Sequence, residues 1–309
     1  MKIALIIIGS ILAFLLVIFF AAIISMYVMI YRSPKKWQLN DRNIKDSMIY
    51  QNYDQSIKDM IDYLMAIPFE NVYIESFDKK KMRAKLYLNE VSNKVAILCH
   101  GYRGTTYRDF CGGAREFIDM GYNVILIDER AHDSSAGHSI TFGVKERKDV
   151  LKWIDFAKER FDNPELVLVG ISMGAATVLN ISNRIDNNIK IIADCPYASI
   201  KELFIHHTKA LKLPVFIIFP LLWMSALLFA RANINDFDNY RSIKETTNPI
   251  LIIHGTADKV VPYQMSQRLY ETYQDKIQYA LFEGAEHGES YLADKQRYQD
   301  IVKHFLEKK

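Results

Sequence analysis

Cysteine is scarce in this chain, with three residues among 309, far apart and mostly inside apolar runs. An odd number at such distances excludes a disulfide framework and a cysteine metal site, so Cys99, Cys111 and Cys195 are expected to be free buried thiols. The chain also lacks a marked excess of positive or of negative charge. The 39 basic and 36 acidic residues leave a net charge of +3 without a basic block, which argues against a nucleic-acid partner.

No charged residue occurs between Ile3 and Ile30. As a helix this run would be about 42 Å long, more than the roughly 30 Å hydrocarbon core of a bilayer, so it can cross with tilt. A cleaved signal peptide would normally have a shorter apolar region and a small-residue cleavage site, whereas this run ends at Tyr31-Arg32. We therefore expect residues 1–31 to be an uncleaved transmembrane anchor that holds the protein at the cell membrane.

Basic residues flank this anchor unequally. Lys2 and the terminal amine precede it, whereas Arg32, Lys35 and Lys36 follow it. By the positive-inside rule this difference of one or two charges favours a cytoplasmic catalytic part.

Residues 32–70 are polar and helix-prone, and we expect a juxtamembrane helical segment that covers the following domain and ends at Pro68. Its apolar positions are spaced as a stripe along one side of a helix. They are Ile44, Met48, Ile57, Met60, Ile61 and Leu64.

From residue 71 to residue 309, short apolar runs alternate with helical patterns. VYIES and MRAKLYL resemble a hairpin, and VAILCH, YNVILID, ELVLVG, IKIIAD, ILIIH and IQYALF are of buried-strand type. This alternation predicts an α/β domain with a parallel sheet covered on both faces. The helical patterns are Phe110–Met120, Val144–Phe161, Met173–Arg184 and Tyr263–Tyr273.

A long interval between IKIIAD and ILIIH breaks this alternation. It includes an uncharged run, Leu213–Ala230, that is long enough to cross a membrane. If it crossed, the strands before and after it would end on opposite sides of the bilayer, and Pro214 and Pro220 would interrupt the helix. We expect instead a helical cap at about 196–245, whose apolar side chains line a hydrophobic substrate pocket, touch the bilayer, or both.

Ser172 lies between two glycines where a predicted strand meets a predicted helix. The pentapeptide Gly170-Ile171-Ser172-Met173-Gly174 matches the G-x-S-x-G nucleophile elbow in the context that this motif requires. A tight turn alone would also need the glycines, because a side chain at either position would collide with the neighbouring strand or helix. We interpret the turn as one that presents Ser172 as a nucleophile.

A serine hydroxyl needs a base to take its proton, and the base needs an acid to orient it. Among the eight histidines His287 is best placed, because it follows the last predicted strand at the sheet edge where Ser172 is expected. Asp258 follows the strand ILIIH, and Asp194 at the end of IKIIAD is the competing acid. The order Ser172, Asp258, His287 is that of α/β-hydrolases.

Two backbone N–H groups are the expected donors to the oxyanion that develops on the substrate, those of Tyr102 and Met173. Tyr102 lies in the turn HGYRG at 100–104, where Gly101 lets the backbone bend toward the serine. His100 is expected to brace this loop through hydrogen bonds rather than to act as a catalyst.

The segments HGYRG, GISMG, HGTADKVVP and AEHG together resemble the α/β-hydrolase superfamily from about Asn71 to Lys309. The N-terminal anchor, and CPYASIKELF leading into a cap, resemble the membrane-anchored α/β-hydrolase-domain proteins, often grouped with the serine aminopeptidase-like hydrolases. This resemblance implies an eight-stranded, mostly parallel sheet and a triad of Ser172, Asp258 and His287.

The segment DERAHDSSAGHSITFG resembles the D-x-R-G-H-G-x-S-x-G segment of that family. Ala131 and Asp133 stand where glycines are usual. Arg130 and Glu146 are expected to form a structural ion pair beneath the site.

These features predict a membrane-tethered serine hydrolase that cleaves carboxylic esters of apolar or lipid-like molecules, as a carboxylesterase or lipase does. A thioesterase or a peptidase would use the same machinery. From a different class, a non-catalytic membrane-bound binding protein on this fold is the alternative. We expect a small-molecule acyl substrate and no metal or organic cofactor.

Overall fold

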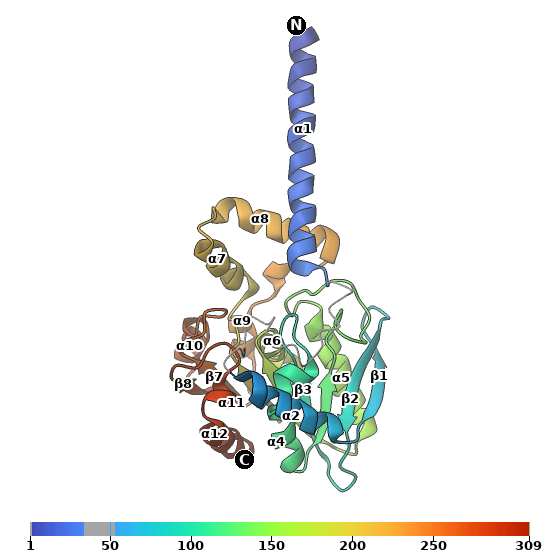
Figure 1. The fold of residues 1–309 in the computed structure, drawn as a ribbon, viewed down its shortest axis with the longest axis vertical. Helices are drawn as coiled ribbons and strands as arrows, with labels where there is room; N and C mark the ends of the chain where they lie inside the picture. Colours follow the sequence, from blue (N-terminus) through green and yellow to red (C-terminus); the bar gives the residue numbers. More distant parts are fainter. Residues whose placement is uncertain (1, 34–49, 51–52, 309) are drawn as a thin grey trace.

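The computed structural model describes residues 2–33, 50 and 53–308. A long helix, α1 (Lys2–Met26), continues as a π-helical turn, η1 (Tyr27–Tyr31), and projects from an α/β domain (Figure 1). This helix is long and apolar enough to cross a membrane, and an 18-residue stretch of it has no buried residue.

The described part of the segment 32–70 forms one helix, α2 (Asp54–Ala66). Its apolar stripe is buried through Ile57, Ile61 and Leu64, and the helix ends before Pro68, as the pattern predicted. Four residues used in the predictions lie outside the described residues: Lys35, Lys36, Ile44 and Met48.

Eight strands form one sheet in the order β1-β2-β4-β3-β5-β6-β7-β8. β1 pairs antiparallel with β2 and β2 with β4, whereas β3 to β8 run parallel. The predicted eight-stranded, mostly parallel sheet is therefore confirmed. The strands are β1 (Glu70–Glu75), β2 (Lys81–Tyr87), β3 (Lys94–Cys99), β4 (Asn123–Ile127), β5 (Glu165–Ile171), β6 (Lys190–Asp194), β7 (Ile250–Gly255) and β8 (Ile277–Phe282).

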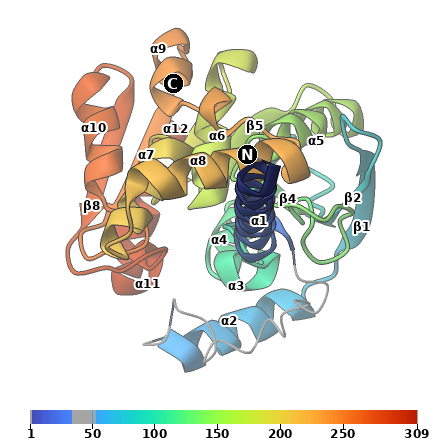
Figure 2. The same cartoon turned by 90° about the horizontal axis from the view of Figure 1, so that it is seen from above.

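Helices cover both faces of this sheet, because alternate residues of a strand point to opposite sides and both sets are apolar. In β3, Val95 and Ile97 pack into one core and Ala96 and Leu98 into the other. The first core contains α5 (Glu146–Arg160), α6 (Met173–Asn180) and α10 (Gln264–Thr272). The second contains α2, α3 (Thr106–Phe110), α4 (Gly113–Asp119) and α12 (Lys295–Glu307), with α2 outermost (Figure 2).

Two local predictions differ from the structure. The helix expected at Phe110–Met120 begins only at Gly113, as α4, and the separate short helix α3 precedes it. Between the two helices, the ring of Tyr291 packs against Gly112, where an added Cβ would lie 2.1 Å from it.

The expected Arg130–Glu146 ion pair is replaced by other partners. Arg130 Nε lies 2.7 Å from Asp149 Oδ2, and its Nη2 lies 3.1 Å from Asp78 Oδ1. Glu146 is the first residue of α5, and its carboxylate accepts hydrogen bonds from the N–H groups of Thr141 and Gly143 in the preceding turn. Asp149, one turn further along α5, is the residue that reaches the arginine.

The interval between β6 and β7 forms the predicted cap. It consists of α7 (Ile200–Ala210), α8 (Val215–Ser225), a π-helical turn η4 (Ala226–Ala230) and α9 (Asn239–Glu245). β6 and β7 are parallel neighbours in the same sheet, so the apolar run between them does not cross to the other side of a membrane. α8 runs across the base of α1 (Figures 1 and 2).

The turn between β5 and α6 brings backbone segments into direct contact. A Cβ on Gly170 would lie 2.3 Å from the carbonyl carbon of Gly174, and a Cβ on Gly174 would lie 1.9 Å from the carbonyl oxygen of Cys99. Between them, Ser172 has φ 55° and ψ −112°, which L-residues rarely adopt. The close packing of β3, β5 and α6 therefore fixes the serine in a strained position.

We expect Gly174→Ala to destabilise the protein, because the new methyl group can fit only if the backbone of β3 or α6 moves. Overpacking of this kind typically costs about 1–3 kcal/mol, or a fall of several degrees in the melting temperature. Gly113→Ala is the matched control, since its Cβ would meet nothing closer than 3.5 Å. Thermal unfolding of both variants in detergent checks this, and equal melting temperatures would contradict it.

Candidate active site

Three loops at one edge of the sheet bring together the residues predicted to carry chemistry. Ser172 follows β5, Asp258 follows β7, and His287 follows β8. Because these strands are parallel, their carboxyl ends lie at the same edge. Residues separated by more than 100 positions thus become neighbours.

The three side chains form a hydrogen-bonded line. His287 Nε2 lies 2.8 Å from Ser172 Oγ, and His287 Nδ1 lies 2.7 Å from Asp258 Oδ2. His287 and Asp258 are each only 6% exposed. With Nδ1–H donated to the carboxylate, Nε2 is left as the acceptor for the serine proton.

Three further groups hold the Asp258 carboxylate. Oδ1 accepts from the N–H groups of Val260 and Val261, each at 2.8 Å. Oδ2 lies 3.1 Å from His254 Nε2, and His254 Nδ1 in turn lies 2.7 Å from Ser266 Oγ. His254 was not predicted from the sequence, although the spacing of His254 and Asp258 within HGTAD was a signal that could have identified it.

The charges of His287 and Asp258 each shift the pKa of the other residue. Burial alone would lower the pKa of His287, but the negative charge of Asp258 and the hydrogen bond to it raise the pKa above its ordinary value. Burial would raise the pKa of Asp258, but His287 and His254 lower it well below its usual range. The carboxylate therefore stays ionised and stabilises an imidazolium at His287.

Asp194, the competing acid, makes no hydrogen bond to His287 among the contacts of the described residues. Its Oδ1 lies 3.4 Å from Ser290 Oγ, and burial raises its pKa to about 7. Its backbone carbonyl oxygen accepts from the N–H of Ser172 at 2.9 Å. Asp194 thus supports the serine through its main chain.

The loop at 100–104 passes directly over the serine. A Cβ on Gly101 would lie 3.3 Å from Asp109 Oδ2 and 3.4 Å from Ser172 Cβ, so the loop packs closely against the serine. His100 Nδ1–H donates to the carbonyl oxygen of Gly101 at 2.9 Å, and its Nε2 accepts from the N–H of Glu129 at 3.0 Å. Both ring nitrogens of His100 are thus used to hold the loop.

His132 holds the same loop from the other side. Its Nε2 accepts from the N–H of Arg103 at 3.1 Å, and its Nδ1–H donates to the carbonyl oxygen of Arg130 at 2.9 Å. Met173 is the first residue of α6, so its N–H has no acceptor within the helix.

The loop also contacts the end of the N-terminal helix, and no local sequence pattern predicts this contact. The hydroxyl of Tyr102 donates to the carbonyl oxygen of Ile30 at 2.7 Å, and Arg103 Nη2 donates to that of Met29 at 2.7 Å. The ring of Tyr102 stacks on Phe142 with centroids 4.6 Å apart.

One group of side chains in the site has metal-ligating atoms. The ligand atoms of Cys195, Asp258 and His287 lie within 4.8 Å of one another. However, the last two are already hydrogen bonded to each other, and burial raises the pKa of the Cys195 thiol well above its ordinary value. A thiol that stays protonated is a poor metal ligand.

Comparisons with known proteins identify the family and the fold. The family model of the prolyl oligopeptidase family matches residues 109–309. The uncharacterized protein YqkD of Bacillus subtilis is 28% identical over 215 residues, which are 68% of this chain and 70% of that protein. The lysophosphatidylserine lipase ABHD12 of Danio rerio is 25% identical over 58% of this chain, but only 47% of its own length is matched.

Solved structures show the same fold. The esterase Pf2001 of Pyrococcus furiosus has a TM-score of 0.63 and 22% identity, over 81% of this chain and 94% of the esterase. Est1E of Butyrivibrio proteoclasticus, solved with ferulic acid, has a TM-score of 0.62 and 22% identity, over 76% of this chain and 97% of Est1E.

The superfamily predicted from the four motifs is thus confirmed. Because the family match covers well over half of the chain and most of the catalytic domain, this chain belongs to the prolyl oligopeptidase family of α/β-hydrolases.

Proposed function

We propose that this hydrolase cleaves carboxylic esters with Ser172 as nucleophile, His287 as base and Asp258 as the acid that orients the base. The observation that carries the proposal is the line of short hydrogen bonds from Ser172 Oγ through His287 to Asp258. A strained serine backbone at a strand-to-helix turn, in contact with a histidine, is the arrangement that activates a hydroxyl for attack.

The reaction proceeds in two halves. Ser172 Oγ attacks the acyl carbonyl while His287 Nε2 takes its proton, and the N–H groups of Tyr102 and Met173 donate to the oxyanion. His287 then protonates the leaving alcohol, which departs and leaves an acyl-serine. Water attacks this ester, again with His287 as base, and the acid leaves with Ser172 restored.

An apolar ester is the proposed substrate class. The cap includes α8 (Val215–Ser225), which has no charged residue and is mostly apolar. Relatives and structural neighbours named as a lysophosphatidylserine lipase and as esterases support ester cleavage. The family match to a group of oligopeptidases favours peptide cleavage as the second candidate.

The anchor predicted at residues 1–31 is proposed to place this activity at the membrane. α1 has the length and composition of a membrane-crossing helix. The basic residues that follow it outnumber those before it, which supports a cytoplasmic catalytic domain.

We expect a fluorophosphonate probe to label the wild-type protein and not Ser172→Ala, because the probe reacts with an activated serine. Hydrolysis of p-nitrophenyl esters should fall by at least about a thousandfold in the same variant. The corresponding anilides, measured in parallel, separate an esterase from a peptidase. Ser134→Ala is the control, since Ser134 is an exposed serine of a loop; equal labelling of wild type and Ser172→Ala would contradict the role of Ser172.

Activity should depend on pH through His287, which must be neutral to accept the serine proton. Because Asp258 raises the pKa of His287 above 6.5, kcat/KM should be lost as the pH falls through a midpoint above that value. In Asp258→Asn the raising charge is absent and burial remains, so the midpoint should fall, and kcat should drop about 10⁴-fold. The pH profile of a soluble ester checks this, and identical midpoints in both proteins would refute it.

A further inference from the structure

The part of α1 that stands free of the domain has a defined length. Side chains from Lys2 to Ala21 are exposed, and the first buried residue of the helix is Ile23. From Lys2 to Ala22 the helix extends about 32 Å, close to the roughly 30 Å hydrocarbon core of one bilayer. If α1 crosses a membrane, the membrane surface therefore lies near Ile23.

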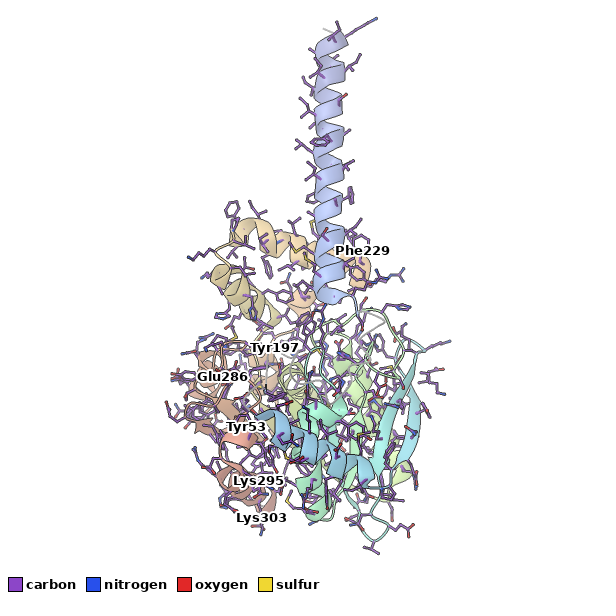
Figure 3. The ribbon with its side chains drawn as sticks, viewed as in Figure 1. Tyr53, Tyr197, Phe229, Glu286, Lys295 and Lys303 are labelled. Atoms are coloured by element: carbon purple, nitrogen blue, oxygen red, sulfur yellow. The ribbon has the colours of Figure 1, made fainter. Side chains whose placement is uncertain are left out.

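The cap lies at this level. Tyr27 and Phe229 contact each other with ring centroids 5.4 Å apart, and Figure 3 shows Phe229 beside the base of α1. α8 extends from this contact across the base of the helix (Figures 1 and 2). The cap is thus placed along the plane of the membrane surface, not beneath it.

The exposed side chains of this part of the cap are apolar. Phe216 is 80% exposed and Leu228 is 50% exposed. These exposed apolar side chains, here called the apolar patch, are unfavourable in water and mark a surface that contacts a partner. The other exposed members are Leu211, Leu213, Ile217, Leu227 and Phe229.

The charges around this patch have one sign. The sequence from Leu203 to Asn235 has no Asp or Glu, whereas Lys209, Lys212 and Arg231 are exposed. Basic residues at the edge of an apolar patch are attracted to anionic lipid headgroups, by about 1 kcal/mol each near the surface.

We propose that α8 and η4 lie in the headgroup–acyl boundary of the bilayer that α1 crosses, with anionic lipids as the partner. The proposal rests on the proposed anchoring by α1. It gives a reason for the absence of charge between Leu213 and Ala230.

A fluorescent label at the patch tests this contact in the full-length chain. NBD attached to Phe216→Cys, or to Leu228→Cys, should shift to shorter wavelength in proteoliposomes of phosphatidylcholine and phosphatidylglycerol, and lipids with a nitroxide on the acyl chain should quench it. The three native cysteines are buried and compete little for the label. Val91→Cys, 96% exposed at the opposite edge of the sheet, is the control and should show neither change.

Labels at 216 and 228 that are as accessible to aqueous iodide as the label at 91 would overturn the proposal. Resistance of the protein to alkaline extraction is measured on the same vesicles. If the alkaline wash extracts the protein, the proposed anchoring by α1 is refuted. If the protein stays inserted and the labels remain in water, only the proposed contact between the cap and the membrane is refuted.

A second inference rests on the contacts between η1 and the loop at 100–104. The last carbonyl groups of a helix lack partners within it, and here those of Met29 and Ile30 accept from Arg103 and Tyr102. The backbone N–H of Tyr102 is the proposed oxyanion donor. We infer that the end of α1 is a positioning element that holds this donor in place, so the anchor contributes to the rate as well as to location.

Tyr102→Phe tests this inference, because it removes only the hydroxyl and keeps the ring and the backbone N–H. On a soluble ester, kcat should fall about two- to tenfold with little change in KM. Tyr27→Phe is the matched control, since its hydroxyl bonds to Ser139 at 2.9 Å and not to the loop. Equal kcat values for the two variants would overturn the inference, whereas absence of esterase activity in the wild type would instead refute the proposed function.

Discussion

Burying a carboxylate costs free energy unless hydrogen bonds or an opposite charge stabilise it. The residues around Asp258 provide this stabilisation. Two backbone N–H groups and His254 fix the carboxylate, so that one oxygen is aimed at His287. The same charge raises the pKa of His287 and fixes its ring with Nε2 toward Ser172. In the proposed mechanism, Asp258 therefore both orients the ring of His287 and stabilises its charged form.

The N-terminal helix contacts this site in space, in addition to being joined to it along the chain. Its last turn accepts hydrogen bonds from the loop that passes over Ser172, and its exposed length matches the thickness of a bilayer. The cap packs against the same turn. The cap and the loop at 100–104 thus both contact η1, and in the proposed arrangement the membrane surface lies near the same turn.

The sequence predicted the features that depend on local patterns. Buried strands have a distinct composition, and the glycines around Ser172 report backbone contacts that exclude a Cβ. What it missed depends on distant partners. Tyr291 packs against Gly112, Arg130 pairs with Asp149 instead of Glu146, and Tyr102 contacts Ile30. No short-range pattern encodes these pairs, because each becomes adjacent only when the sheet has formed.

The most direct test of the central claim is a crystal structure of the full-length protein after reaction with a phosphonate. The account predicts phosphorus bonded to Ser172 Oγ and the phosphoryl oxygen within hydrogen-bond reach of the N–H groups of Tyr102 and Met173. His287 should remain bonded to Asp258. Phosphorus on another side chain, or a His287 ring turned away from Asp258 with no bond to it, would contradict the account.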